Sequence, residues 1–343
     1  MTGEILVVGT GVVGLTMAVE LAHRGVDVRI IGPLPAHPAA DILALEPTTL
    51  EIFARLGISD QLTSRGVRAD GVNVFRDGKP VAHLRIDRPT PHPYILIVRR
   101  RELEEMLQTR LTSLGVIVER DVELVELTQW ADEVDTELRH KDLHVEQTTA
   151  RWVVGCDGAS SIVRHEIGLP LAGPAPDEEI TIAEVRIAGD VPPDALHWAH
   201  GHDRFVGCSP TPDGRHQLAL VHRPKQASGG AVTFTELQKA LDQFAFPSAA
   251  VAEIINARRF PNLRRVAGRQ APGRVFLAGD AAQVHSAFTG FGENNGVHDA
   301  FALGEKLSAA TSGQVRGGVL GVIGRTSPGT SRRPGRRHGG PAR

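Results

Sequence analysis

Hydrophobic residues follow two different spacings along the chain, and these spacings predict where its strands and helices lie. Ile5–Val8 is a continuous apolar run of strand length, followed by apolar residues at helical spacing and then a second strand at Val28–Ile31. Helical spacing returns in Pro47–Leu56 and in residues 103–114. The succession of strand, helix and strand predicts an α/β protein that begins with a βαβ unit.

Two other stretches consist of short β-rich runs, as in an antiparallel sheet. The expected strands are Val72–Phe75, Val81–Ile86 and Tyr94–Val98, and later Ile180–Ile187, Arg204–Cys208 and Gln217–Val221. Helices are expected around Leu237 and Leu241, and around Val251, Ile254 and Ile255. We interpret both stretches as parts of one second domain, inserted into the α/β domain in two pieces.

Composition places the protein among ordinary globular chains. Its 343 residues are 41% hydrophobic and 23% charged, which allows one large core or two smaller ones. Two cysteines imply no disulfide framework, the strand at Ile5 leaves no room for a signal peptide, and no apolar run reaches membrane-spanning length. We therefore expect a cytoplasmic protein with no membrane partner.

The formal net charge of −2 hides a difference between the tail and the rest of the chain. Residues 311–343 contain seven Arg, nine Gly, three Pro and no acid, so the first 310 residues carry 31 basic and 40 acidic side chains. This composition predicts a disordered tail. We do not expect it to bind nucleic acid, and we interpret the abrupt change after about Ser308 as a truncation or a shifted reading frame.

A glycine fingerprint follows the first strand directly. In the run Gly9-Thr10-Gly11-Val12-Val13-Gly14, the first glycine makes a tight turn, the second lets the backbone approach a pyrophosphate and the third lets helix pack on strand. The run predicts a dinucleotide site. The acid that usually ends the second strand and binds the ribose is replaced by Gly32. We therefore expect weak cofactor binding, and Gly32→Glu to tighten it.

Two further motifs place a carboxylate just after a strand, where α/β sheets bind ligands. Asp157-Gly158 follows the predicted strand Trp152–Val154, and Gly279-Asp280 follows Arg274–Ala278. A loop with Gly290 and Gly292 then leads into a helix, whose free N–H groups can face a negative centre.

These motifs, in this order, resemble those of the FAD-dependent aromatic hydroxylases, the p-hydroxybenzoate hydroxylase-like flavoprotein monooxygenases. The resemblance covers residue 4 to about 307 and implies that Arg100, in Arg100-x-x-Leu103-x-x-x-Leu107, contacts FAD. We interpret Arg99 and Arg101 as a solvated corner, and Glu293 as a carboxylate that opposes negative charge on the flavin. The residues expected at the cofactor are Gly9, Gly11, Val12, Val13, Gly14, Arg100, Asp157, Gly158, Gly279, Asp280, Gly290, Gly292 and Asn294.

The resemblance also implies a domain arrangement. The FAD-binding domain, Rossmann-like, would comprise residues 1–69, 99–174 and 258–310. The substrate domain, an antiparallel β-sheet plus helices, would comprise residues 70–98 and 175–257. The tail 311–343 belongs to neither.

The activity implied by the resemblance is hydroxylation. NAD(P)H reduces FAD, O₂ adds at flavin C4a, and one oxygen passes to an aromatic or polyketide-like small molecule. No residue stands out as catalytic, no metal site is predicted, and the oligomeric state stays open. Two alternatives remain: a flavin oxidoreductase that inserts no oxygen, and a truncated, non-catalytic flavin-fold protein.

Overall fold

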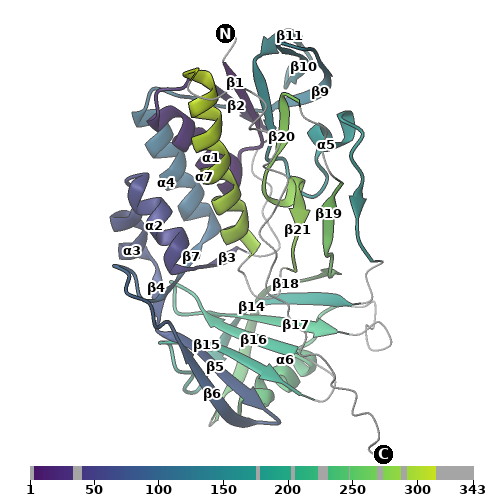
Figure 1. Cartoon of the computed structure of the whole chain (residues 1–343). Coiled ribbons are helices and arrows are strands. Elements are labelled where there is room, and N and C mark those ends of the chain that lie inside the picture. Colours follow the sequence, from purple (N-terminus) through teal and green to yellow (C-terminus); the bar gives the residue numbers. More distant parts are fainter. Residues whose placement is uncertain are drawn as a thin grey trace, which may run out of the picture.

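The structure is a computed structural model of the chain, and it describes residues 4–33, 41–174, 178–201, 205–222, 231–246, 248–268, 273–286 and 292–313. A parallel sheet with its helices forms one half of the molecule, and a large mixed sheet crosses the other half (Figure 1). The predictions for Gly290 and for the tail beyond residue 313 lie outside the described residues.

A five-stranded parallel sheet is the centre of the first half. In spatial order its strands are β20 (Val275–Leu277), β12 (Trp152–Gly155), β1 (Ile5–Val8), β2 (Val28–Gly32) and β8 (Val118–Arg120). Ile5 and Val7 belong to the core shared with the helices, whereas Leu6 and Val8 belong to the core on the opposite face. Because both faces are buried, the strand is apolar at every position.

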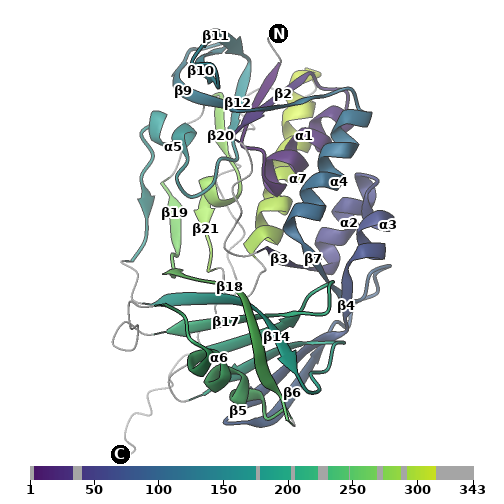
Figure 2. The same cartoon turned by 180° about the vertical axis from the view of Figure 1, so that it is seen from behind.

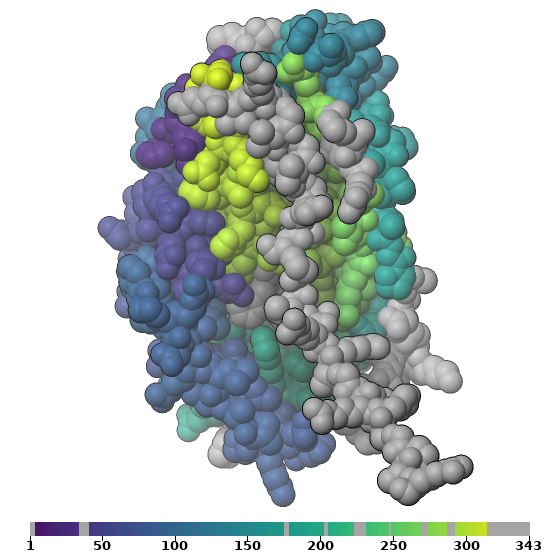
Figure 3. Space-filling model, viewed as in Figure 1, coloured from purple at the N-terminus to yellow at the C-terminus, as the bar shows by residue number. Residues whose placement is uncertain are grey.

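Helices cover one face of the parallel sheet. They are α1 (Val12–His23), α2 (Pro47–Arg55), α3 (Ser59–Arg65), α4 (Arg100–Ser113) and α7 (Gly292–Thr311). In the space-filling view α7 is the yellow band between the N-terminal helices and the green strands near the end of the chain (Figure 3). It ends at Thr311.

The other face is covered by a three-stranded antiparallel sheet of β9 (Val122–Gln129), β10 (Val134–His140) and β11 (Val145–Ala150), together with α5 (Ile162–Glu166). A second small sheet, of β13 (Leu171–Ala172), β19 (Arg265–Ala267) and β21 (Gln283–Val284), leads toward the 3₁₀ turn η2 (Gly279–Ala281).

The second half of the molecule is a seven-stranded sheet. Its order is β18 (Ala250–Pro261), β14 (Glu179–Ala188), β17 (His216–His222), β16 (Phe205–Pro210), β15 (Leu196–His200), β5 (Gly71–Arg76) and β6 (Lys79–Arg85). All neighbours are antiparallel except β15 and β5. Helix α6 (Phe234–Leu241) and the turn η1 (Asp242–Phe244) pack on one face (Figure 2).

One strand predicted for this sheet belongs elsewhere. Tyr94–Val98 forms most of β7 (Ile95–Arg99), which pairs with β3 (Ile42–Leu45) and β4 (Val67–Ala69) in a separate sheet. Leu96 and Val98 pack in the helix-side core, whereas Ile95 and Ile97 pack toward the seven-stranded sheet. The strand lies between the two halves, and both its faces are therefore apolar.

The helix predicted around Val251, Ile254 and Ile255 is wrong. These residues form β18, whose pairing with β14 shifts register between Glu184 and Val185 and again between Arg186 and Ile187. Each shift adds one residue to β18, so that positions three apart, Val251 and Ile254, contact the same core. The two bulges thus give this strand a spacing of apolar residues that is typical of a helix.

The predicted domain boundaries at 98/99 and 257/258 fall within β7 and β18, and the division into domains stays a prediction.

Backbone contacts at the carboxyl end of β1 leave room for glycine alone. Gly9 has φ of +117°, and a Cβ there would lie 2.3 Å from the Cys156 carbonyl oxygen. A Cβ at Gly14 would lie 1.9 Å from the Gly9 carbonyl oxygen. The fingerprint, the start of α1 and the segment after β12 are therefore in direct backbone contact.

We predict that Gly14→Ala destabilises the protein by about 1–3 kcal/mol, the usual cost of forcing a methyl group into a packed site. Gly11→Ala is the matched control, because a Cβ at Gly11 would meet only the Glu104 carboxylate, at 3.7 Å. Urea denaturation of both variants measures the difference. Equal stability of the two would show that the backbone contact is not as tight as described.

Candidate functional site

The carboxyl ends of the parallel strands bring the three predicted motifs together. Gly9 follows β1 and Cys156 follows β12. Gly279 follows β20 after one intervening residue, Ala278. Hydrogen bonds join these ends, from the Cys156 N–H to the Val8 carbonyl at 2.7 Å and from the Ala278 N–H to the Gly155 carbonyl at 2.9 Å. Segments more than a hundred residues apart in sequence thus form one edge, the position at which such sheets bind ligands.

A cavity of about 530 Å³ lies at this edge. Of the predicted cofactor residues, those that line it are Gly9, Gly11, Arg100, Asp157 and Gly158. The lining residues that sequence reasoning did not select are Val8, Thr10, Gly32, Pro33, Glu104, Val122, Glu123, Leu124, Arg139, Cys156, Ser160 and Ile162. Several belong to β9 and β10, and no local motif distinguishes them from other strand residues.

The start of α1 faces this cavity without a side-chain cap. Gly11 is the N-cap residue, no side chain caps the helix, and its first turn contains no acid. Its free N–H groups and the positive end of the helix dipole suit a pyrophosphate. The side chains of Val12 and Val13 point elsewhere: Val12 is fully buried, and Val13 packs close to Gly279 and Gly296. These two residues can contribute only backbone N–H groups.

Asp157 has one carboxylate oxygen in use and one without a partner. Oδ2 accepts a hydrogen bond from the Val163 N–H at 3.1 Å, whereas Oδ1 is buried without a partner among the described residues. Burial raises the pKa of Asp157, and hydrogen bonds to Ser161 and nearby backbone N–H groups oppose the rise. A buried acceptor without a donor is costly, and a ligand hydroxyl would satisfy it.

Arg100 lies among carboxylates at the start of α4. Its Nη2 donates to Glu293 Oε2 at 2.9 Å, and its Nε is buried without a partner among the described residues. Burial lowers the pKa of Arg100, but Glu293, Glu104 and Asp280 outweigh burial and raise it. Glu293, expected to oppose a negative flavin, is thus neutralised by the arginine expected at the cofactor.

Asn294 has a positioning role in the fold, and its contact with the cofactor stays a prediction. Its side chain is 2% exposed, Nδ2 donates to the Ala44 carbonyl at 2.8 Å, and Oδ1 accepts from the Glu46 N–H at 2.9 Å. It therefore connects α7 to the segment before α2.

Two predicted cofactor glycines lie near the same helix. Gly279 is buried beside Val13, and Gly292 begins α7 near His285.

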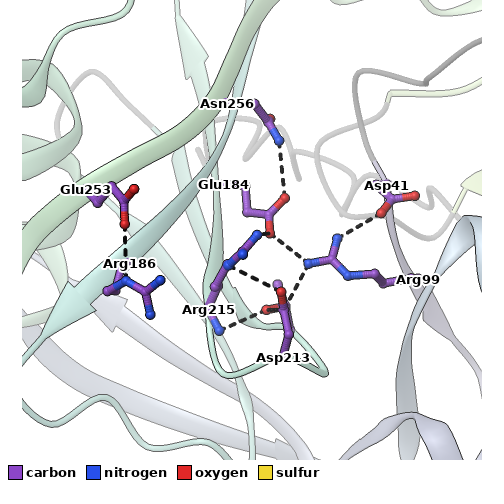
Figure 4. A network of polar contacts seen from close by, with 9 residues as sticks. Asp41, Arg99, Glu184, Arg186, Asp213, Arg215, Glu253 and Asn256 are labelled. Carbon is purple, nitrogen blue, oxygen red and sulfur yellow. Dashed lines mark hydrogen bonds and ion pairs between the residues drawn. The ribbon is translucent and has the colours of Figure 1, made fainter.

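Arg99 is not a solvated corner, contrary to the prediction. It is 18% exposed and pairs with Asp41 at 2.8 Å, Glu184 at 2.7 Å and Asp213 at 2.9 Å. Figure 4 shows that Arg215 and Asn256 complete the network around Glu184. Glu184 lies on β14 and Arg99 at the end of β7, so the network joins the two halves of the molecule. The network lines a second cavity, of about 760 Å³. Arg100 and Glu104 line both this cavity and the cavity of about 530 Å³.

Arg164 is a further residue that sequence reasoning missed. Its guanidinium donates to the Ala281 carbonyl at 3.0 Å and to the Ala159 carbonyl at 2.7 Å. It thereby joins the segment after β12 to the segment after β20. Nothing in the local sequence predicts this role, because both partners are backbone carbonyl groups.

A side chain at position 32 would collide with its surroundings, which changes the prediction made for Gly32→Glu. A Cβ at Gly32 would lie 2.9 Å from both Thr10 Cγ2 and Thr10 Oγ1. Thr10 is held in turn by Arg120, whose Nη1 donates to Thr10 Oγ1 at 2.6 Å. The variant must therefore displace this pair, and the expected tightening of cofactor binding no longer follows.

Two kinds of site are not found in the part of the chain that the structure describes. No group of three or more His, Cys, Asp or Glu side chains is arranged there to hold a metal ion. Within the same ranges, no helix has the length and hydrophobicity required to span a lipid bilayer.

The fold and the glycine-rich edge define a dinucleotide-binding flavoprotein architecture. The chain belongs to the FAD binding domain family, whose profile matches residues 2–321. The family predicted from the motifs is confirmed, and the match extends beyond residue 307, where the resemblance was expected to end.

Similar proteins carry the names of monooxygenases. The chain is 35% identical over 327 residues to 6-methylpretetramide 4-monooxygenase of Streptomyces rimosus, covering 92% of this chain and 58% of that protein. It is 30% identical over 332 residues to pentachlorophenol 4-monooxygenase of Sphingobium chlorophenolicum, covering 92% and 60%. The crystal structure of p-nitrophenol 4-monooxygenase from Pseudomonas putida DLL-E4 has the same fold, with a TM-score of 0.83 at 23% identity, over 94% of this chain and 83% of that one.

We predict that Arg99→Gln lowers the free energy of unfolding by about 2–3 kcal/mol, because it removes the cation beside Asp41 and leaves Glu184 and Asp213 with Arg215 alone. Arg101→Gln should change it by less than about 0.5 kcal/mol, since Arg101 is 73% exposed and, among the described residues, pairs only with Glu105. Urea denaturation at neutral pH compares the two variants. Similar small losses in both would mean that the network adds little to stability.

We also predict a pH-dependent gain in stability for Asp280→Asn in the cofactor-free protein. Desolvation and then Glu293 raise the pKa of Asp280 to about 6, while Arg100 opposes the rise. Because Asp280 is exposed to solvent, screening makes the effect on stability small. An aspartate in an unfolded chain has a pKa of about 3.9, so ionising Asp280 costs the folded state stability as pH rises from about 4 to 6. The variant should melt at a higher temperature than the parent at pH 8 and at the same temperature at pH 4. A difference that does not depend on pH would contradict this electrostatic origin.

Proposed function

We propose that the protein binds FAD along the carboxyl edge of the parallel sheet and uses NAD(P)H and O₂ to hydroxylate an aromatic or polyketide-like small molecule. The observation that supports this most directly is the meeting of Gly9–Gly14, Asp157-Gly158 and Gly279-Asp280 at one edge of the sheet, where residues of the first two motifs line the same cavity. The names of the relatives support the reaction and the substrate class. The chain spans only 58% and 60% of their lengths, so their activities enter here as part of the proposal.

The residues at this edge fit the cofactor chemically. The uncapped start of α1 offers N–H groups to a pyrophosphate, and the unpartnered Asp157 Oδ1 can accept a hydrogen bond from a ribose or ribityl hydroxyl. The unpartnered Arg100 Nε is a donor for a phosphate oxygen or a flavin carbonyl. Both unsatisfied polar groups thus acquire partners of the right kind.

When bound, FAD supplies the transfer of electrons from NAD(P)H and the activation of O₂, which no protein side chain supplies. The chain binds the nucleotide, orients the ring and excludes water. Asp280, Glu293 and Glu104 surround Arg100, so this region carries more negative than positive charge. Helix α7, held by Asn294, fixes Glu293 beside Arg100.

The second candidate is a flavin oxidoreductase that inserts no oxygen, and the truncated, non-catalytic protein is the third. Substrate-dependent consumption of NAD(P)H by the 343-residue chain separates an enzyme from a non-catalytic binder. Incorporation of oxygen-18 from O₂ into the product then separates hydroxylation from simple oxidation. Consumption without incorporation would favour the oxidoreductase.

We predict that Asp157→Asn weakens FAD binding roughly tenfold, about 1.4 kcal/mol, because an amide in place of the carboxylate removes one charged acceptor. The change keeps an oxygen for the Val163 N–H, so the fold should be preserved. Asp190→Asn, on the exposed segment after β14, is the control and should bind FAD like the parent. Quenching of flavin fluorescence measures the affinities. A parent protein that does not bind FAD would refute the proposed function, and equal affinities would remove only the role of Asp157.

A further inference from the structure

A carboxylate from α4 lies at the start of α1. A Cβ placed on Gly11, the N-cap residue of α1, would lie 3.7 Å from Glu104 Oε1. The first turn of α1 contains no acid, and no side chain caps the helix. Glu104 therefore brings a negative charge to a helix start that has none of its own. Negative charge is what the free N–H groups and the helix dipole attract at this position.

Packing of α4 against α1 sets the position of Glu104. Its neighbours in the helix, Leu103 and Leu107, are fully buried in the same core as Leu15 of α1. By contrast, no hydrogen bond and no ion pair within 4.0 Å restrains the Glu104 carboxylate among the described residues, and Arg100 and Arg120 attract it only from a greater distance. The carboxylate can therefore move away from α1 without breaking a polar contact.

The Glu104 side chain also faces the space proposed for the cofactor. It lines the cavity of about 530 Å³ together with Gly9, Gly11 and Arg100, and it lines the cavity of about 760 Å³ as well. The start of α1 is the part of this edge that suits a pyrophosphate. A carboxylate and a pyrophosphate are both anions, and the same N–H groups cannot serve both at once.

The charges around Glu104 only partly compensate its own. The charged groups that face it are Arg100 on its own helix, Arg120 at the end of β8, Glu293 in the first turn of α7 and Asp41 before β3. Burial raises the pKa of Glu104, Arg100 opposes the rise, Glu293 adds to it, and Arg120 and Asp41 act in opposite directions. A bound pyrophosphate would add further negative charge and disfavour the ionised carboxylate still more.

We propose that Glu104 is a built-in competitor of the FAD pyrophosphate, whose carboxylate must be displaced from the start of α1 or neutralised when the cofactor binds. The inference rests on the proposed function, because it needs FAD at this edge. It gives the chain a means of keeping its cofactor exchangeable, and it makes FAD affinity fall as pH rises and Glu104 ionises. Weak cofactor binding would then originate at Glu104, on α4.

The test is a titration of the cofactor-free full chain with FAD, followed by quenching of flavin fluorescence at pH 8 and at pH 5. Glu104→Gln removes the charge and keeps the shape of the side chain, so it should bind FAD about fivefold more tightly than the parent at pH 8. At pH 5 this ratio should fall toward one, because the parent carboxyl is then largely neutral. Glu105→Gln, the same change at the next residue, should match the parent at both pH values, since Glu105 is 59% exposed and pairs with Arg101.

A second variant controls for effects of the substitution on the fold. Glu104→Asp keeps the charge but withdraws it by one methylene group, and its FAD affinity at pH 8 should lie between those of the parent and Glu104→Gln. Weaker or unchanged binding by Glu104→Gln at pH 8, or a gain of the same size at both pH values, would overturn the inference. FAD binding by the parent would still support the proposed function in each of these cases. A parent that does not bind FAD at either pH would refute the proposed function and, with it, the inference.

Discussion

Backbone contact at the carboxyl ends of β1 and β12 is the constraint on which the rest of the site depends. Gly9 and Gly14 have no side chains, and the fingerprint can therefore touch the Cys156 carbonyl and the start of α1 at once. This contact aims the uncapped N-terminus of α1 into the cavity and brings Asp157 beside it. Arg164 then joins the segment after β12 to the segment after β20, because its guanidinium donates to the backbone carbonyls of Ala159 and Ala281. A nucleotide site results from segments that are remote in sequence.

Electrostatics at this edge do not favour the cofactor-free fold. Arg100 is surrounded by three carboxylates, Asp280 has a raised pKa, and two polar atoms, Arg100 Nε and Asp157 Oδ1, are buried without partners in the described region. Local violations of this kind are typical of functional sites, where a ligand supplies what the protein lacks. The network around Arg99 differs, because its donors and acceptors are matched and it serves to join the two halves.

The sequence predicted the parts of the fold that depend on local pattern. The strand Ile5–Val8, the helix starting at Pro47 and the motif order followed from apolar runs and glycines, and the structure confirms them. β18 was missed because two bulges give a strand a helical spacing. Arg99 and Arg120 were missed because their partners, such as Asp41, Glu184 and Thr10, come from other segments. The residues next to each arginine in the sequence do not indicate which distant segment its side chain pairs with.

Hydrogen–deuterium exchange of the full chain, with and without FAD, tests most directly whether the cofactor lies along this edge. Binding should slow exchange together in residues 9–14, 156–163 and 278–282, because the first two segments line the cavity and hydrogen bonds from Ala278 and Arg164 join the third to them. Strands β5 and β6, in the far part of the seven-stranded sheet, should exchange as before. Protection of one segment alone, or none at all at saturating FAD, would contradict a site shared by the three.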